Sequence, residues 1–464
     1  MNDNFDDFFR SFINGGGGFQ LPGSFNPIDL MKQIQQLFNG SAQPVNWETA
    51  TETAMRKIAG EPQMSAGDAA RVRDALRAAQ LWLDPATSIS PNSGQAAAWS
   101  RKQWVENSIP AWKNLCEPIA VNTTHALAGA IEKQMGSQLS DLKAIAAVPG
   151  MPGLTENLGP ISMDNVFRSL SGLLYGIRLG EAIGTLASNA FGSCDIGLPI
   201  TDGSLSALIW ANVNEFASDL DIGAEDALTF LALRQSAQAR LLGSVPWLAM
   251  ELENAVLTYA TEIQIDEDAI ERMVSNLQEG MISMDGLQQS LGDASTLDIF
   301  STKPTPAQTR AAERLEQLLA VSEGWVDEVT LRAGTPYIPT VLPLTEMMRR
   351  RKAMGTPVEQ MLKILIGLEV SPARSRNAQK LWSKLTDEVG IEGRDRYFTH
   401  PDVIPTLEEL EDPEHFLEHR VGMSAENAAL DDELNSMLDG TLGWAEGLSP
   451  EIDSEGDAGK GSEN

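Results

Sequence analysis

The chain has few residues that can form disulfides or bind metals. Only two cysteines, Cys116 and Cys194, and four histidines occur in its 464 residues. Two cysteines can pair only once, which excludes a disulfide-rich scaffold, and they cannot form a cysteine-based metal motif. A reducing compartment is the simplest interpretation of this cysteine content.

Positive charge is also scarce. The 34 lysines and arginines are outnumbered by 65 aspartates and glutamates, which gives a formal net charge of -31. Such a chain repels phosphate backbones and anionic lipid headgroups, so we expect no nucleic-acid partner and no membrane surface as a partner. Residues 1–18 carry acids where a signal peptide carries positive charge, and they contain no continuous apolar stretch. We therefore expect a cytoplasmic protein.

Runs that alternate polar and apolar residues, as strands do, are nearly absent. Instead, hydrophobic residues recur with the helical period in segments such as ARVRDALRAAQLWL and PAQTRAAERLEQLLAVSEGWVDEV. With 42% hydrophobic residues, the chain can bury a large core. The pattern predicts a mainly α fold, a multi-helix bundle with few or no strands.

Composition changes at both ends of this helical region. Residues 1–45 contain the glycine run Gly15–Gly18, and we predict a flexible N-terminal arm there. Residues 423–464 are rich in acids, with Lys460 as their one basic residue, and are predicted to form a disordered acidic tail. Between them, residues 46–422 contain no clear linker and are predicted to form a single helical domain.

Four glycines recur at every fourth residue along one predicted helix, which lets another backbone approach that face closely. They are Gly172, Gly176, Gly180 and Gly184. Charged residues interrupt the apolar run around them, namely Arg168, Arg178 and Glu181. We therefore predict tight packing inside a helical bundle and no membrane span.

The helix predicted around LALRQSAQARLLGSVPWL, residues 231–248, has polar residues in its apolar stripe. Leu228, Leu231, Gln235, Gln238 and Leu242 follow helical spacing and share one face. A glutamine amide that faces a core without a partner costs roughly 1–3 kcal/mol. This face therefore carries a polar network or opens onto a pocket.

One metal motif is present in the sequence. HFLEH matches H-x-x-E-H, in which His415 and His419 would bind zinc and Glu418 would serve as the base. The segment follows the acid-rich stretch PTLEELEDPE, which favours a solvated terminal helix over a walled metal site. We keep this motif as the less favoured alternative.

The remaining candidates are isolated residues and one basic run. His125 and His400 are lone histidines, which are more often structural than catalytic. The run MRRRK, which contains Arg349–Lys352, could hold an anion. Cations at a helix end more often cap the helix dipole and pair with nearby acids, and we favour that interpretation.

Several segments resemble a known family, the actinobacterial zincin-like hydrolases, also labelled zinc-dependent metalloproteases. They are residues 231–248, EGWVDEV, IGLEVSPARSRNAQKLWSKL and GIEGRDRYFTHPDVIPTLEELEDP. The resemblance extends over residues 46–413. It implies that the helical domain has zincin-like core helices and that intact relatives are zinc-dependent hydrolases.

In that family the quoted helix carries H-E-x-x-H, and a later helix carries a glutamate in an E-G-x-x-D context. The resemblance places Arg234, Gln235 and Gln238 at the motif's working positions, and Glu323 and Asp327 in the later context. Arginine has no lone pair for zinc, and the amide of Gln235 cannot accept a proton as a general base does. Gln238 offers only a weak amide ligand.

These changes lead to a hypothesis for the motif. An Arg234–Glu323 ion pair, flanked by Gln235 and Gln238, replaces the zinc and holds the two helices together. The chain is then a metalloprotease homologue without zinc, cofactor or catalysis that binds a peptide or protein. Two alternatives stay open: an active metal-dependent hydrolase or peptidase that uses an unrecognised site, for instance with His125 or His400, and a purely structural assembly subunit.

Overall fold

The structure is a computed structural model. It describes residues 43–91, 94–121, 163–201, 205–218, 223–262, 304–353, 373–417 and Arg420. Nearly all of the predicted N-terminal arm and all of the predicted acidic tail lie outside these residues. So do His125, Glu418 and His419. The chain divides into two compact units, Met1–Leu407 and Glu408–Asn464, and each is described by itself.

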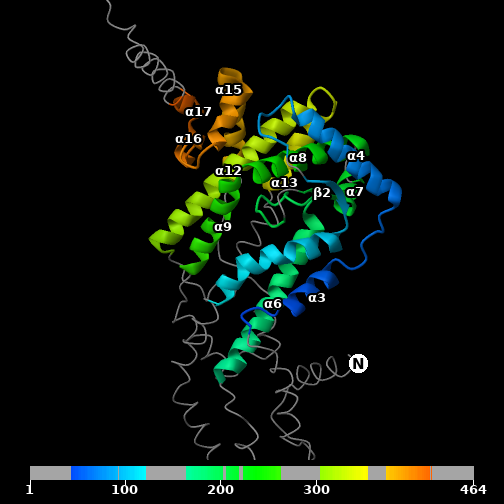
Figure 1. Cartoon of the computed structure of the whole chain (residues 1–464), viewed down its shortest axis with the longest axis vertical. Helices are drawn as coiled ribbons and strands as arrows, with labels where there is room; N and C mark the ends of the chain where they lie inside the picture. Colours follow the sequence, from blue (N-terminus) through cyan, green and yellow to red (C-terminus); the bar gives the residue numbers. More distant parts are fainter. Residues whose placement is uncertain are drawn as a thin grey trace, which may run out of the picture. The chain divides into compact units, whose positions relative to one another are not determined.

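Helices dominate the described residues, which confirms the predicted mainly α class (Figure 1). Residues 101–121 are also helical, in cyan in the figure. The helices of the first unit are α3 (Trp47–Lys57), α4 (Ala66–Leu83), α6 (Met163–Asn189), α7 (Trp210–Ser218), α8 (Ala224–Ser244), α9 (Pro246–Thr261), α12 (Pro306–Gly334), α13 (Val341–Ala353), α15 (Ala373–Asp395) and the 3-10 turn η2 (Arg396–Phe398). Two short helices follow, α16 (Leu407–Glu411) and α17 (Pro413–Phe416).

The strands in the described residues form one small parallel sheet. Strand β1 (Ala96–Trp99) pairs with β2 (Ser206–Ile209) in the register Ala96 opposite Ser206 and Trp99 opposite Ile209. Every residue of β2 is buried, because β1 lies beside it and α8 packs against it. The sheet therefore lies inside the helical core, next to α8.

The glycine face of α6 packs against α3, as the four-residue spacing predicts. A Cβ atom added to Gly176 would lie 2.5 Å from the carbonyl oxygen of Asn46, and one added to Gly180 would collide with the carbonyl oxygen of Ala50. Only glycine allows this approach of two backbones. In the part of the chain that the structure describes, no helix has the length and apolar character to cross a membrane.

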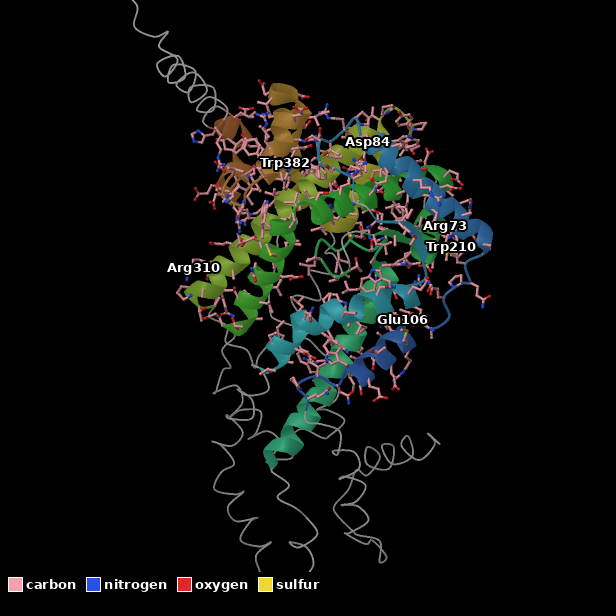
Figure 2. The ribbon with its side chains drawn as sticks, viewed as in Figure 1. Arg73, Asp84, Glu106, Trp210, Arg310 and Trp382 are labelled. Carbon is pink, nitrogen blue, oxygen red and sulfur yellow. The ribbon has the colours of Figure 1, made fainter. Side chains whose placement is uncertain are left out.

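Helix α8 is the centre of the first unit. It packs against α4, α7, α9, α12, α13 and β2, and nearly every side chain from Ala227 to Leu242 is buried. Helix α12 begins with a capping box formed by Thr305 and Gln308 and packs against α8, α9 and α15. Trp382 of α15 donates to the carbonyl oxygen of Val321 where α15 meets α12 (Figure 2). Polar residues on the sides of α8 and α12 that face each other are therefore buried between the two helices.

Helix α13 returns the chain to α8 and α12 after a tight turn. The amide of Ile338 donates to the carbonyl oxygen of Gly334 at 2.8 Å, which closes the turn after α12. Thr340 then donates to the Asp226 carboxylate at 2.6 Å, which ties the start of α13 to the first turn of α8. As a result, the basic residues in the last turn of α13 lie within reach of α12.

Candidate functional site: a buried ion cluster

Four charged side chains from three helices form a buried cluster, called the ion cluster below. Arg234 of α8 donates through Nη2 to Glu323 Oε2 at 2.5 Å and through Nη1 to Asp327 Oδ1. Lys352 of α13 donates through Nζ to the same Glu323 oxygen and lies 3.5 Å from both Asp327 oxygens. The Arg234 side chain is only 5% exposed and that of Asp327 only 7%. The predicted Arg234–Glu323 ion pair is thus present, with two further members.

The cluster is balanced in charge. Burial would raise the pKa of Glu323, but Lys352 and Arg234 outweigh it and hold this pKa below its usual value. The pKa of Asp327 is lowered in the same way, against burial, by the same two cations. Burial lowers the pKa of Arg234, yet the two carboxylates reverse this and raise it. Glu323, Asp327 and Arg234 are therefore ionised at neutral pH, and the formal charges of the four side chains cancel.

Gln235 does not extend this cluster but fastens a neighbouring loop. Its Nε2 donates to Ser193 Oγ at 2.9 Å, and its Oε1 accepts from the Cys194 amide at 3.3 Å. A Cβ on Gly192 would collide with the Gln235 amide, so the loop backbone lies directly on α8. The general-base position of the family motif, as the resemblance assigns it, therefore has a loop-binding role here.

Gln238 lies one turn further along α8 and is 3% exposed. Its Nε2 is buried and has no hydrogen-bond partner within the described residues. Ser322 of α12 also has a buried, unpartnered hydroxyl there. The polar network that we expected around both glutamines is thus interrupted at Gln238.

The loop from Asn189 to Thr201 covers the other side of the cluster. Its backbone is fixed by Asp195, whose carboxylate accepts from the Phe191 amide at 2.9 Å. Gly197 adopts a φ of 75°, which favours glycine, and a Cβ there would lie 3.8 Å from Glu323 Oε1. The loop therefore packs closely over Glu323.

The basic run at the end of α13 does more than cap a helix. Lys352 enters the ion cluster, and Arg351 donates to the carbonyl oxygen of Asn189 at 2.5 Å. The Arg351 guanidinium lies 4.2 Å from the centre of the Phe191 ring. Arg349 donates to Gln379 of α15. Lys352 pairs with nearby acids, as predicted. The sequence did not reveal that this pairing is buried between α12 and α13.

The comparisons with known proteins agree with this architecture. The model of the zincin-like metallopeptidase family matches residues 45–417. The chain belongs to this family. None of the curated proteins compared with the chain matches it.

A solved structure from Chloroflexus aurantiacus, described as a "putative hydrolase with a novel fold", is similar to this member of the zincin-like metallopeptidase family. The TM-score is 0.54 at 14% sequence identity, and the match covers 82% of this chain and 99% of the other. At that identity the likeness extends to the fold alone. A similar overall fold is thus found in a second protein.

A zincin-like metallopeptidase is expected to hold zinc through histidines and a glutamate. The residues of the ion cluster do not fit that ion. The Arg234 guanidinium has no lone pair and carries a permanent positive charge that repels a cation. Carboxylates can bind zinc, but those of Glu323 and Asp327 are both bound by Arg234 and Lys352. A divalent ion would have to displace both of these cations.

Among the other candidate residues, His400 belongs to the same unit as the ion cluster but is not part of it. His400 has a side chain that is 63% exposed, and its Nδ1 accepts from the Asp402 amide at 3.3 Å. His415 is exposed in α17, and its two partners in the H-x-x-E-H motif lie outside the described residues. Across the described ranges, no group of three histidine, cysteine, aspartate or glutamate side chains could hold a metal. The H-x-x-E-H alternative itself stays a prediction.

Proposed function

We propose that this chain is a member of the zincin-like metallopeptidase family that has lost zinc binding and peptide hydrolysis and acts by binding a peptide or protein. The observation that carries this proposal is the contact of Arg234 with both Glu323 and Asp327. A residue at the position of a zinc ligand has become the counter-ion of the carboxylates that remain.

The charge of the cluster supports the proposal. A zinc ion brings two positive charges to its ligands, and Arg234 and Lys352 together bring the same number to Glu323 and Asp327. Buried carboxylates without a counter-charge would be strongly destabilising, so the loss of a metal requires such a replacement. The two cations keep α8, α12 and α13 together without a metal.

Catalysis also lacks its proton acceptor at the motif. Hydrolysis by a zincin needs a general base beside the metal-bound water. The Gln235 amide cannot accept a proton at neutral pH, and both ends of this amide are bound by the loop. The motif positions therefore provide neither a strong zinc ligand nor a general base for peptide hydrolysis.

The filled ion cluster favours binding at the surface over binding at the old metal position. Taken as whole residues, Arg234, Gln235 and Gln238 are each at most 4% exposed, so a ligand cannot reach them without moving a helix or the loop. Surface next to the loop is accessible instead, and a groove beside Leu198 is lined by aliphatic side chains. Such grooves favour peptide side chains.

A second candidate function, an assembly subunit, is favoured by a specific surface feature. Trp82 and Tyr337 stack with their ring centroids 4.1 Å apart, and Tyr337 is 51% exposed. Leu81 and Leu342, which are close to these aromatics in the sequence, are also exposed. Exposed aromatic and leucine side chains of this kind are frequent in protein interfaces.

The test combines cleavage and binding in one experiment. The full chain is incubated with a library of random hexapeptides, with and without added zinc, and bound and free peptides are identified by mass spectrometry. We expect bound peptides that share a sequence preference and no cleavage products. Products that increase with zinc and disappear with a chelator would contradict the proposal. Absence of bound peptides, together with self-association, would favour the assembly subunit.

A further inference from the structure

We propose that a groove between α9, the helix of residues 101–121 and the loop at residues 198–200 binds one aliphatic side chain of a peptide that carries a positive charge beside it. This proposal rests on the proposed peptide-binding function and names the class of peptide. The groove is lined by Ala111, Asn114, Leu115, Leu198, Pro199, Ile200, Glu253, Val256 and Leu257.

The walls of the groove suit a single aliphatic side chain. Most of the lining residues are aliphatic, and they come from three separate segments of the first unit. The cavity measures about 50 Å³. A single water needs about 10–15 Å³ of such space, so the groove has room for one branched aliphatic side chain.

Its rim has an uncompensated negative charge. Glu253 is exposed on α9, and none of the described residues pairs with its carboxylate. Partial burial raises the pKa of Glu253, as expected for a carboxylate that borders an apolar surface. Lys113, a lysine on the neighbouring helix of residues 101–121, does not pair with Glu253 but lies over the Trp47 ring, at 5.8 Å from its centre. A ligand cation beside the aliphatic side chain would supply the missing partner.

Asn114 and the overall charge of the chain also suit a basic peptide. Asn114 is exposed at the groove, and its amide can donate to and accept from the backbone of a peptide. The net charge of -31 attracts basic ligands over a distance and increases their association rate. Basic peptides are therefore favoured over acidic ones before contact as well as within the groove.

The loop that forms one wall is held by its own backbone and by α12. The Ile200 amide donates to the carbonyl oxygen of Leu198 at 2.8 Å across Pro199, which makes a tight turn. Gly197, just before this turn, packs against Leu319 and close to Glu323 of α12. These contacts fix the loop wall of the groove, and a wall that is fixed before binding lowers the entropy cost of binding.

The test uses fluorescein-labelled hexapeptides and fluorescence anisotropy on the full chain. One pair of peptides contains Leu-Lys or Lys-Leu at its centre, and the matched pair contains Leu-Glu or Glu-Leu. We expect the lysine peptides to bind the unmodified chain with the lower Kd. Glu253→Lys should weaken their binding about threefold to fivefold, the range of an exposed ion pair, and reverse the preference between the two pairs.

Two further variants complete the test. Glu388→Lys reverses an exposed charge on α15, outside the groove, and should leave the preference unchanged. Ala111→Phe fills the groove and should weaken binding at least tenfold while the melting temperature stays within a few degrees, because Ala111 is only half-buried. A preference that survives Glu253→Lys, or binding that survives Ala111→Phe, would overturn the proposed groove.

The failure of this proposal is distinguishable from failure of the proposed function. If the hexapeptide library binds but both groove variants bind it as the unmodified chain does, the groove is wrong and peptide binding stands. If the unmodified chain binds neither the library nor the leucine peptides, the groove and the peptide-binding function both fail. The loss of zinc binding is tested separately, by metal content.

Discussion

Arg234 and Asp327 form a buried ion pair across the interface of α8 and α12, although 93 positions separate them in the sequence. The same guanidinium contacts Glu323, one turn earlier on α12. A planar guanidinium with several N–H donors can bind two carboxylates at once, as one metal ion can. Under the proposed loss of zinc, this guanidinium holds α8 and α12 together in place of a metal.

Removal of the guanidinium should destabilise the protein strongly. Arg234→Met leaves Glu323 and Asp327 buried with Lys352 as their remaining cation, and we expect a loss of about 3–5 kcal/mol in the free energy of unfolding. Urea denaturation measures it. Arg77→Met is the control, because Arg77 pairs with Asp74 on the surface, where a salt bridge contributes about 0–1 kcal/mol. Equal losses in both variants would contradict a special role for Arg234.

Lys352 should control the acid stability of the fold. The pKa values of Glu323 and Asp327 are lowered in the folded state, so their contribution to stability is present above the unfolded pKa values. It is lost as the pH falls through the lower, folded values. Lys352→Met removes the cation that lowers the Glu323 pKa most, so this loss should begin at a higher pH.

The measurement is the free energy of unfolding in urea from neutral pH to about pH 3, a range that includes the ordinary carboxylate pKa values. Lys352→Arg retains the positive charge and is the matched control, with a profile close to that of the unmodified chain. If Lys352→Met and the unmodified chain lost stability over the same pH range, Lys352 would not be part of the cluster's electrostatics.

Restoration of the family motif should require the removal of Lys352 as well. The triple change Arg234→His, Gln235→Glu and Gln238→His supplies ligands for zinc, but the Lys352 ammonium still binds the Glu323 carboxylate. We expect cobalt(II) to give the visible absorption bands of a tetrahedral site only when Lys352→Met is added. Addition of Glu323→Gln to that quadruple variant should remove the bands.

Circular dichroism shows whether each variant keeps its helices. A helical quadruple variant that binds no cobalt would mean that Arg234, Gln235, Gln238 and Glu323 do not occupy the positions of the family's metal site. A helical triple variant that binds cobalt as tightly as the quadruple variant would show that Lys352 does not compete with a metal.

The packing of α6 on α3 depends on glycine. Gly176→Ala places a Cβ 2.5 Å from the Asn46 carbonyl oxygen, which is backbone and cannot turn away. We expect a loss of about 1–3 kcal/mol from overpacking, measured as a lower midpoint of urea denaturation. Gly67→Ala in the first turn of α4 is the control, since its Cβ would meet only Ser65 Oγ at 3.7 Å. Unchanged stability of Gly176→Ala would contradict the observed contact.

The sequence predicted the helices well, because hydrophobic residues with a period of 3.6 specify the buried face of each helix. It also predicted the contact of Arg234 with Glu323, since the family resemblance placed these residues on facing helices. The strand β1 was not predicted, because AAAW has no alternation of polar and apolar residues. Its pairing with β2 depends on a contact between residues more than a hundred positions apart.

The role of Lys352 could not be read from the sequence either. The run MRRRK indicated cations at a helix end, but which of them faces α12 depends on the tight turn after Gly334 and the rotation of α13. The contacts of Gln235 could not be predicted for a similar reason. Its partners, Ser193 and Cys194, lie in a loop whose path no local pattern specifies.

The metal content of the untagged, undialysed full chain tests the central claim most directly. Elemental mass spectrometry gives the zinc-to-protein ratio, and melting curves with and without chelator show whether a bound ion stabilises the fold. If the ion cluster has replaced the metal, zinc is far below one equivalent and the melting temperature does not change with chelator. Near-stoichiometric zinc, with a lower melting temperature after chelation, would contradict this account.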